Sequence, residues 1–233
     1  MNTAVMIKPS VAFAAGCLFL LVATRKVLLP LPTSVVAGVD VLSGLLAMAW
    51  AVHLQLSGSD PFLVKSFWIG TALGMVWEVL FDVFGDGFCS ILAEELLFVP
   101  GTRAVAHSLL DGVIFVVGVW LCRDLLGGKA YSVATSFSVK ELAIMFLWGN
   151  LQEIFVDYVG QDWVWKFHPG FCLDLGAGEL CNGVMLEMFG RRFTWAPQVT
   201  WIIAPCVFYA LLLAIGGDGS RRAREQGGKR RSD

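Results

Sequence analysis

Charge is scarce in this sequence. Only 15% of the 233 residues are Asp, Glu, Lys or Arg, against about a quarter in typical soluble domains. Apolar residues make up 57% of the chain, and the mean hydropathy is +0.70. So few charges do not supply the polar surface that a soluble domain needs, and the net charge of −2 gives no basis for nucleic-acid binding.

Metal-binding patterns are also missing. The chain has only three histidines, and its six cysteines are spread singly without a Cys-x-x-Cys pair. We therefore expect no metal site and no cofactor. Cys172 and Cys181 lie in one connecting segment, and they could form a disulfide if that segment faces an oxidising compartment; the sequence leaves this open.

Long apolar runs are what the chain has in abundance. A membrane-spanning helix needs about 20 mostly apolar residues. Six segments approach this length: residues 11–24, 34–56, 62–84, 103–122, 137–159 and 194–215. The sequence therefore predicts an all-α, polytopic membrane helical bundle, with about six (six to seven) transmembrane helices in one domain over residues 1–216.

Two long connections each contain a shorter apolar stretch, at residues 89–99 and 181–189. Both are too short to span a bilayer, so they predict one or two short interfacial or re-entrant helices. Within residues 217–233, the stretch 221–233 carries six basic residues against two acidic ones. They predict a disordered tail on the cytoplasmic side, by the positive-inside rule. An endoplasmic reticulum location is consistent with this tail. The oligomeric state stays open.

Ionisable residues four positions apart occur in three of the predicted spans. The pairs are Glu78 and Asp82, His107 and Asp111, and Glu153 and Asp157. Four-residue spacing places both members on one helix face. Glu78 and Glu153 each lie six residues before the end of their span, about 9 Å along the helix. The fourth span, residues 103–122, runs in the opposite direction, which brings His107 and Asp111 to the same depth. The charges are thus expected to gather in one leaflet.

These six residues are the candidate catalytic groups, because charges inside a bilayer are costly and usually functional. Asp82 and Asp157 lie near helix ends and are also consistent with a simple water interface. Four aromatic residues are candidates for substrate binding: Trp77, Phe81, Trp148 and Tyr158. Trp148 equally fits an aromatic belt at the membrane surface.

Several carboxylates and an imidazole, enclosed away from water, could keep one acid protonated near neutral pH. With aromatic walls to stabilise a cation, such a site could protonate, cyclise or isomerise an isoprenoid or related lipid. We therefore expect a membrane enzyme with a lipid-like substrate. A proton-coupled transporter using the same carboxylates and a non-catalytic membrane subunit remain alternatives.

The stretch Trp77-Glu78-Val79-Leu80-Phe81 resembles the Trp-Glu motif of the small paspaline-type integral-membrane terpene cyclases. This resemblance implies a bundle of about seven spans and a proton-donor role for Glu78. That family carries a second acid in its last span, where this chain has none, so Glu153 or Asp157 would have to replace it. The segment 91–98, which contains Glu94-Glu95, is similar to a motif of membrane lycopene cyclase domains, although it lacks the proline of that motif.

Overall fold

The chain folds into six helices and six short strands in the computed structural model. The model describes residues 8–28, 32–84, 89–91, 101–128, 131–161, 165–168, 170, 172–174, 179–188 and 190–217. The helices are α1 (Pro9–Leu28), α2 (Thr33–Ser57), α3 (Pro61–Phe84), α4 (Thr102–Leu126), α5 (Val139–Gly160) and α6 (Trp195–Ala214). Each begins and ends close to a predicted segment, so the prediction of a mainly helical chain is confirmed. Of the predicted tail, only Gly217 lies within the described residues.

Three of the helices are long and apolar enough to cross a membrane, counting only the described residues. They are the segment Pro61–Phe81 of α3, then Thr102–Leu126 and Trp195–Ala214. Large apolar side chains also cover the outside of the bundle: Phe19, Leu45, Leu46, Leu56, Val76, Leu147 and Ile203 are among those exposed. An apolar exterior of this kind suits lipid rather than water.

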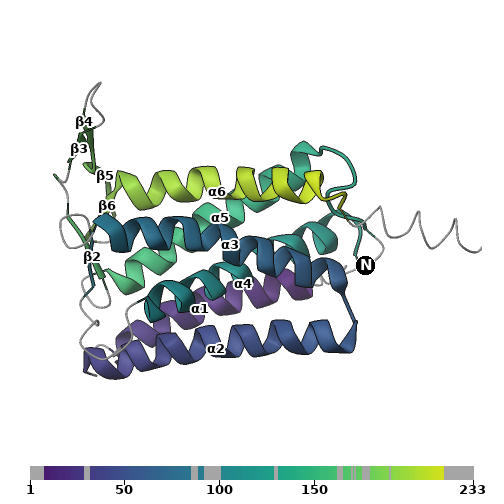
Figure 1. The fold of residues 1–233 in the computed structure, drawn as a ribbon, viewed down its shortest axis with the longest axis horizontal. Coiled ribbons are helices and arrows are strands. Elements are labelled where there is room, and N and C mark those ends of the chain that lie inside the picture. Colours follow the sequence, from purple (N-terminus) through teal and green to yellow (C-terminus); the bar gives the residue numbers. More distant parts are fainter. Residues whose placement is uncertain are drawn as a thin grey trace, which may run out of the picture.

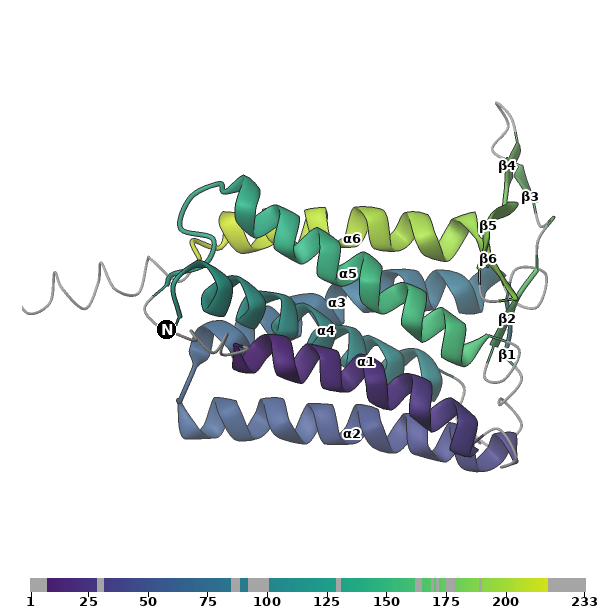
Figure 2. The same cartoon turned by 180° about the vertical axis from the view of Figure 1, so that it is seen from behind.

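Helix α4 lies at the centre of the bundle. It contacts α1, α2, α3 and α5, while α6 packs against α5 and α3 (Figures 1 and 2). Helices α3 and α4 approach closely because glycines face the contact. A Cβ atom at Gly70 would come within 2.7 Å of the Phe115 ring. Small residues allow this approach between membrane helices, where dispersion contacts replace the hydrophobic effect.

All the strands lie at one end of the bundle, called the strand end below (Figures 1 and 2). They are β1 (Cys89–Ile91), β2 (Trp165–Phe167), β3 (Cys172–Asp174), β4 (Glu179–Cys181), β5 (Val184–Met188) and β6 (Arg191–Thr194). They form three antiparallel pairs: β1 with β2, β3 with β4, and β5 with β6.

The short helix predicted over residues 181–189 is wrong, because strands β4 and β5 occupy this segment. Five residues cannot repay the cost of starting a helix. A turn at Gly190, with φ of 72°, instead lets β6 pair with β5 and satisfy its backbone groups. Residues 89–91 of the other predicted interfacial helix are also a strand, and residues 92–99 lie outside the described part of the chain.

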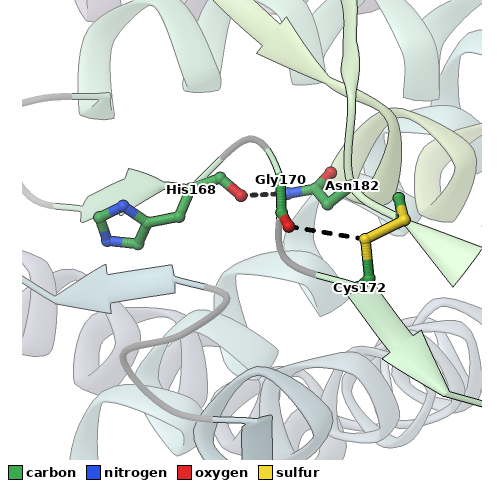
Figure 3. The surroundings of a disulfide bond; sticks show 5 residues. His168, Gly170, Cys172 and Asn182 are labelled. Atoms are coloured by element: carbon green, nitrogen blue, oxygen red, sulfur yellow. Dashed lines mark hydrogen bonds between the residues drawn. A yellow bond between two sulfur atoms is a disulfide. The ribbon is translucent and has the colours of Figure 1, made fainter.

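The Cys172–Cys181 disulfide is confirmed, and it joins β3 to β4. Asn182 connects this hairpin to its surroundings (Figure 3). Its Nδ2 donates to the His168 carbonyl at 3.4 Å, and its Oδ1 accepts from the backbone N–H of Ala196 at 3.0 Å. One buried amide therefore ties the disulfide hairpin to the first turn of α6.

Helices α5 and α6 are joined where a proline interrupts α6. Pro205 has no N–H, so the carbonyl of Trp201 lacks its usual donor one turn later. Asn150 of α5 supplies the missing bond, with its Nδ2 donating to that carbonyl at 3.1 Å. Gly149 allows the approach, since a Cβ atom there would lie 2.6 Å from Pro205 Cγ.

We predict that Asn150→Ala lowers the free energy of unfolding by about 1–2 kcal/mol, because a buried carbonyl loses its only side-chain donor. The loss should be smaller in a Pro205→Ala background, where the restored N–H can bind the Trp201 carbonyl. Unfolding of the four proteins in mixed detergent micelles measures this coupling. Equal losses in both backgrounds would contradict the interpretation.

Candidate functional site

Four buried carboxylates lie together near the strand end. Glu78 is in α3, Asp111 in α4, and Glu153 and Asp157 in α5, and none is more than 7% exposed. Asp157, Asp111 and Glu78 lie close enough to Glu153 to interact with it electrostatically, and Glu78 interacts with Asp111 in the same way. These four residues are called the acid cluster. Burying four acids in an apolar bundle is costly, so each needs a partner or a use.

Glu78 is bound by an arginine. Arg103 Nη1 of α4 donates to Glu78 Oε2 at 2.9 Å, and both side chains are about one-tenth exposed. His107 lies beside them, with its Nδ1 3.7 Å from Glu78 Oε1. Sequence reasoning missed Arg103, although Arg103, His107 and Asp111 follow one another at four-residue intervals. The same spacing rule, extended by one turn, would have found it.

Asp111 is held against α3. The indole Nε1 of Trp77 donates to Asp111 Oδ2 at 3.1 Å. Gly74, one turn before Trp77, leaves the necessary room, because a Cβ atom there would lie 2.5 Å from the same oxygen. Two adjacent residues of α3 thus contact α4: Trp77 binds the acid Asp111, and Glu78, itself an acid, binds Arg103.

Asp157 joins three elements. Its Oδ2 accepts from Gln198 Nε2 of α6 at 2.8 Å, and its Oδ1 accepts from Trp165 Nε1 of β2 at 3.3 Å. Neither Gln198 nor Trp165 was among the predicted site residues. Nothing local in the sequence indicates that α6 meets Asp157.

Glu153 differs from the other three acids. It is 5% exposed and has no hydrogen-bond partner within the described part of the chain. The groups acting on it are the other acids of the cluster, Asp157 first. Among the described residues, no cation lies within ion-pair distance of its carboxyl group. Of the four acids, Glu153 is therefore the one whose carboxyl group is least engaged in structural contacts.

Aromatic rings adjoin the acid cluster on its inner side. The Trp77 ring lies 5.7 Å from that of Trp201 and 6.4 Å from that of Phe115, measured between centroids. Phe115 stacks on Trp201 at 5.6 Å and on Phe208 at 4.3 Å. Helices α3, α4 and α6 thus supply a contiguous group of buried rings next to Asp111, called the aromatic wall below, and aromatic faces attract cations.

The predicted substrate-binding residues separate into different places. Trp77 belongs to the aromatic wall. Phe81 lies nearer the strand end, 5.9 Å from the ring of Phe167 in β2. Trp148 packs between α1, α4 and α5, and its Nε1 donates to the Ile114 carbonyl at 2.8 Å.

Two further predicted site residues are less directly connected to the cluster. Tyr158 is partly buried and directly follows Asp157, so it leaves α5 about 100° away from that acid. Asp82 follows Glu78 by one turn of α3, but its side chain is not among those that the structure describes.

Three buried side-chain oxygens around α5 and α6 have no hydrogen-bond partner among the described residues: Gln152 Oε1, Gln161 Oε1 and Thr194 Oγ1. Gln161 lies one turn beyond Asp157 on α5, and Thr194 lies one turn before Gln198 on α6. Gln161 Nε2 also donates to the Arg192 carbonyl at 2.6 Å, two residues from Thr194. Unpaired oxygens therefore lie between the acid cluster and the strands, where buried water commonly binds such groups.

A fifth buried carboxylate, Glu141, lies at the opposite end of the bundle. Its Oε2 accepts from Tyr209 Oη at 2.7 Å and from the Ala134 N–H at 3.1 Å. Nearby, burial and a hydrogen bond to Glu141 raise the pKa of Tyr131, in the connection between α4 and α5. Glu141 is fully engaged in holding this connection, unlike Glu153.

Among the described residues, no three His, Cys, Asp or Glu side chains are arranged to hold a metal ion. Comparison of the chain with protein-family models, curated proteins and solved structures gives no match. The chemistry of the site must therefore be inferred from its own geometry.

We predict that Arg103→Met destabilises the protein by about 3–5 kcal/mol, because it leaves the Glu78 charge buried and unpaired. The double variant Glu78→Gln/Arg103→Met removes both charges and should recover most of this loss. Thermal unfolding of the three purified proteins in one detergent measures the difference. A double variant no more stable than Arg103→Met would show that Arg103 acts through other contacts.

Proposed function

We propose that this chain is an integral-membrane enzyme that uses carboxylate acid–base chemistry on an isoprenoid or related lipid. The observation that carries the proposal is the unequal engagement of the four acids beside an aromatic wall. Glu78, Asp111 and Asp157 each have a fixed partner, whereas Glu153 has none. Acids in different environments can take different roles in proton transfer.

In this proposal Glu153 is the proton donor. Glu78 is a poor donor, since a carboxylate engaged with Arg103 has no proton to give. This reverses the role that the Trp-Glu resemblance implies. Protonated Glu153 would transfer its proton to a carbon–carbon double bond of the substrate. The rings of Trp77 and Trp201 would then stabilise the carbon cation.

The reaction would end when a base removes a proton from the cation, which leaves a cyclised or isomerised product without net oxidation or reduction. Asp111 is suited to this step, because it adjoins the aromatic wall through Trp77. For the next cycle Asp111 would release the proton that it accepted to water, and Glu153 would regain one through water bound at Gln161 and Thr194, which lie toward the strand end.

A proton-coupled transporter is the second candidate. It is favoured by the mutual influence of the four acids, which three helices contribute to one relay. Against it, α3, α4 and α5 continue as regular helices where they carry the acids, while carriers commonly use broken helices at midplane sites.

We further propose that more than the three most apolar helices cross the membrane, with the strand end in an oxidising compartment such as the endoplasmic reticulum lumen. The Cys172–Cys181 disulfide favours this orientation. The basic residues after Gly217 would then lie on the cytoplasmic side, because α6 ends away from the strands (Figure 1).

We predict opposite labelling of two single-cysteine proteins in sealed microsomes whose cytoplasmic face is outside. Cys172→Ser, with Cys181 retained, should react with a membrane-impermeant maleimide only after detergent is added. Lys140→Cys, at the other end of the bundle, should react without detergent. All other cysteines are replaced in both proteins. The reverse pattern would invert the orientation.

We predict that Glu153→Gln lowers product formation at least about 100-fold, the usual cost of losing a general acid. Lipid profiling of a host supplied with prenylated precursors measures this effect. Glu187→Gln, which changes an exposed strand carboxylate, is the matched control and should keep full activity. Glu78→Gln should lose less activity than Glu153→Gln.

No new product from the wild type with any of the precursors would refute the enzyme. Proton uptake by vesicles that is lost in Glu153→Gln would support the transporter instead. A product that survives Glu153→Gln but not Glu78→Gln would return the donor role to Glu78.

A further inference from the structure

A groove of about 540 Å³ lies at the end of the bundle away from the strands and from the acid cluster. It opens between the last turn of α2, the first turns of α3 and the end of α6. Its lining consists of Leu54, Gln55, Gly58, Pro61, Val64, Lys65, Trp68, Ile69 and Ile215. This volume is within the range of small-molecule sites in proteins.

The groove combines an apolar wall with one cation. Leu54, Val64, Ile69 and Ile215 present hydrocarbon, whereas the polar side chains of the lining are Gln55 and Lys65. A wall of this kind is complementary to an acyl chain. The polar groups are complementary to a headgroup that accepts hydrogen bonds.

The charge of Lys65 is not matched by a carboxylate. Within the described part of the chain, no acid lies within ion-pair distance of it. Asp60, five residues earlier, is already engaged. Its Oδ2 accepts from Arg123 Nη1 at 2.7 Å, and its Oδ1 accepts from the Leu63 N–H at 3.1 Å. Lys65 therefore keeps a net positive charge for a ligand.

The depth of these residues fits a membrane lipid. Lys65 lies four residues into α3, about 6 Å from its start, and Ile69 lies one turn deeper. If α3 spans the bilayer, Lys65 is at headgroup level while Ile69 faces the acyl region. Lysine and tryptophan side chains are common at this boundary, and Trp68 is 38% exposed there.

We propose that this groove binds an anionic phospholipid, with its phosphate at Lys65 and Gln55 and one acyl chain against Trp68 and Ile69. The unmatched cation selects an anionic over a zwitterionic headgroup. The site is separate from the acid cluster, so it stands or falls independently of the proposed enzyme. The bound lipid would anchor the end of the bundle away from the strands, called the non-strand end below, in its leaflet.

Quenching of Trp68 fluorescence by brominated lipids tests the proposal in full-length protein reconstituted into vesicles. The Trp68 signal is the difference between the wild type and Trp68→Phe. Brominated phosphatidylglycerol should quench this signal at an about fivefold lower mole fraction than brominated phosphatidylcholine, as one lysine near an anionic lipid implies.

Lys65→Gln should abolish this preference without lowering the thermal stability. Lys140→Gln is the matched control, because it removes an exposed lysine at the same end of the bundle outside the groove, and it should retain the preference. Val64→Trp, which fills the groove, should reduce quenching by both lipids.

Equal quenching by the two lipids in the wild type would overturn the proposal. So would a preference that survives Lys65→Gln, or one that Lys140→Gln removes equally, since the effect would then come from general surface charge. If oleate displaces phosphatidylglycerol at a lower mole fraction, the occupant is a free carboxylate amphiphile, and the phospholipid assignment is wrong.

Discussion

Polar groups inside this bundle must find partners from other helices, because neither lipid nor an apolar core can hydrogen-bond them. This constraint accounts for side-chain hydrogen bonds that join neighbouring helices. Arg103 of α4 binds Glu78 of α3. Trp77 of α3 binds Asp111 of α4. Each contact fixes the rotation of one helix against its neighbour. The acids therefore determine how the helices pack, as well as what the site can do.

The two ends of the bundle satisfy the constraint differently. At the non-strand end, Glu141 has two donors and closes the connection between α4 and α5. At the strand end, no described residue donates to Glu153 or to the free oxygens of Gln161 and Thr194. A fully paired network gives rigidity, whereas unpaired buried groups are costly to keep. That difference is the physical reason for assigning function to the strand end.

The strands extend this asymmetry. Trp165 of β2 reaches into the bundle to bind Asp157, and Asn182 connects the disulfide hairpin to the start of α6. The strands are therefore attached to α5, which carries two of the acids, and to α6, which supplies Gln198 to Asp157. A substrate or proton approaching from the strand end would meet Gln161 and Thr194 before the acid cluster, while the groove at Lys65 lies at the opposite end of the bundle.

The helices could be predicted from the sequence because their signal is local: about 20 apolar residues in a row need no partner to be recognised. Four-residue spacing likewise identified the faces of α3, α4 and α5 that carry acids. The partners of those acids could not be predicted. Gln198 lies 41 residues from Asp157, and pairing across that distance depends on how α6 packs. The strands were missed for the same reason, since a short strand exists only through its partner. Composition and periodicity thus determined the helices, and only the tertiary structure decided which acid is paired with a cation and which is left without a partner.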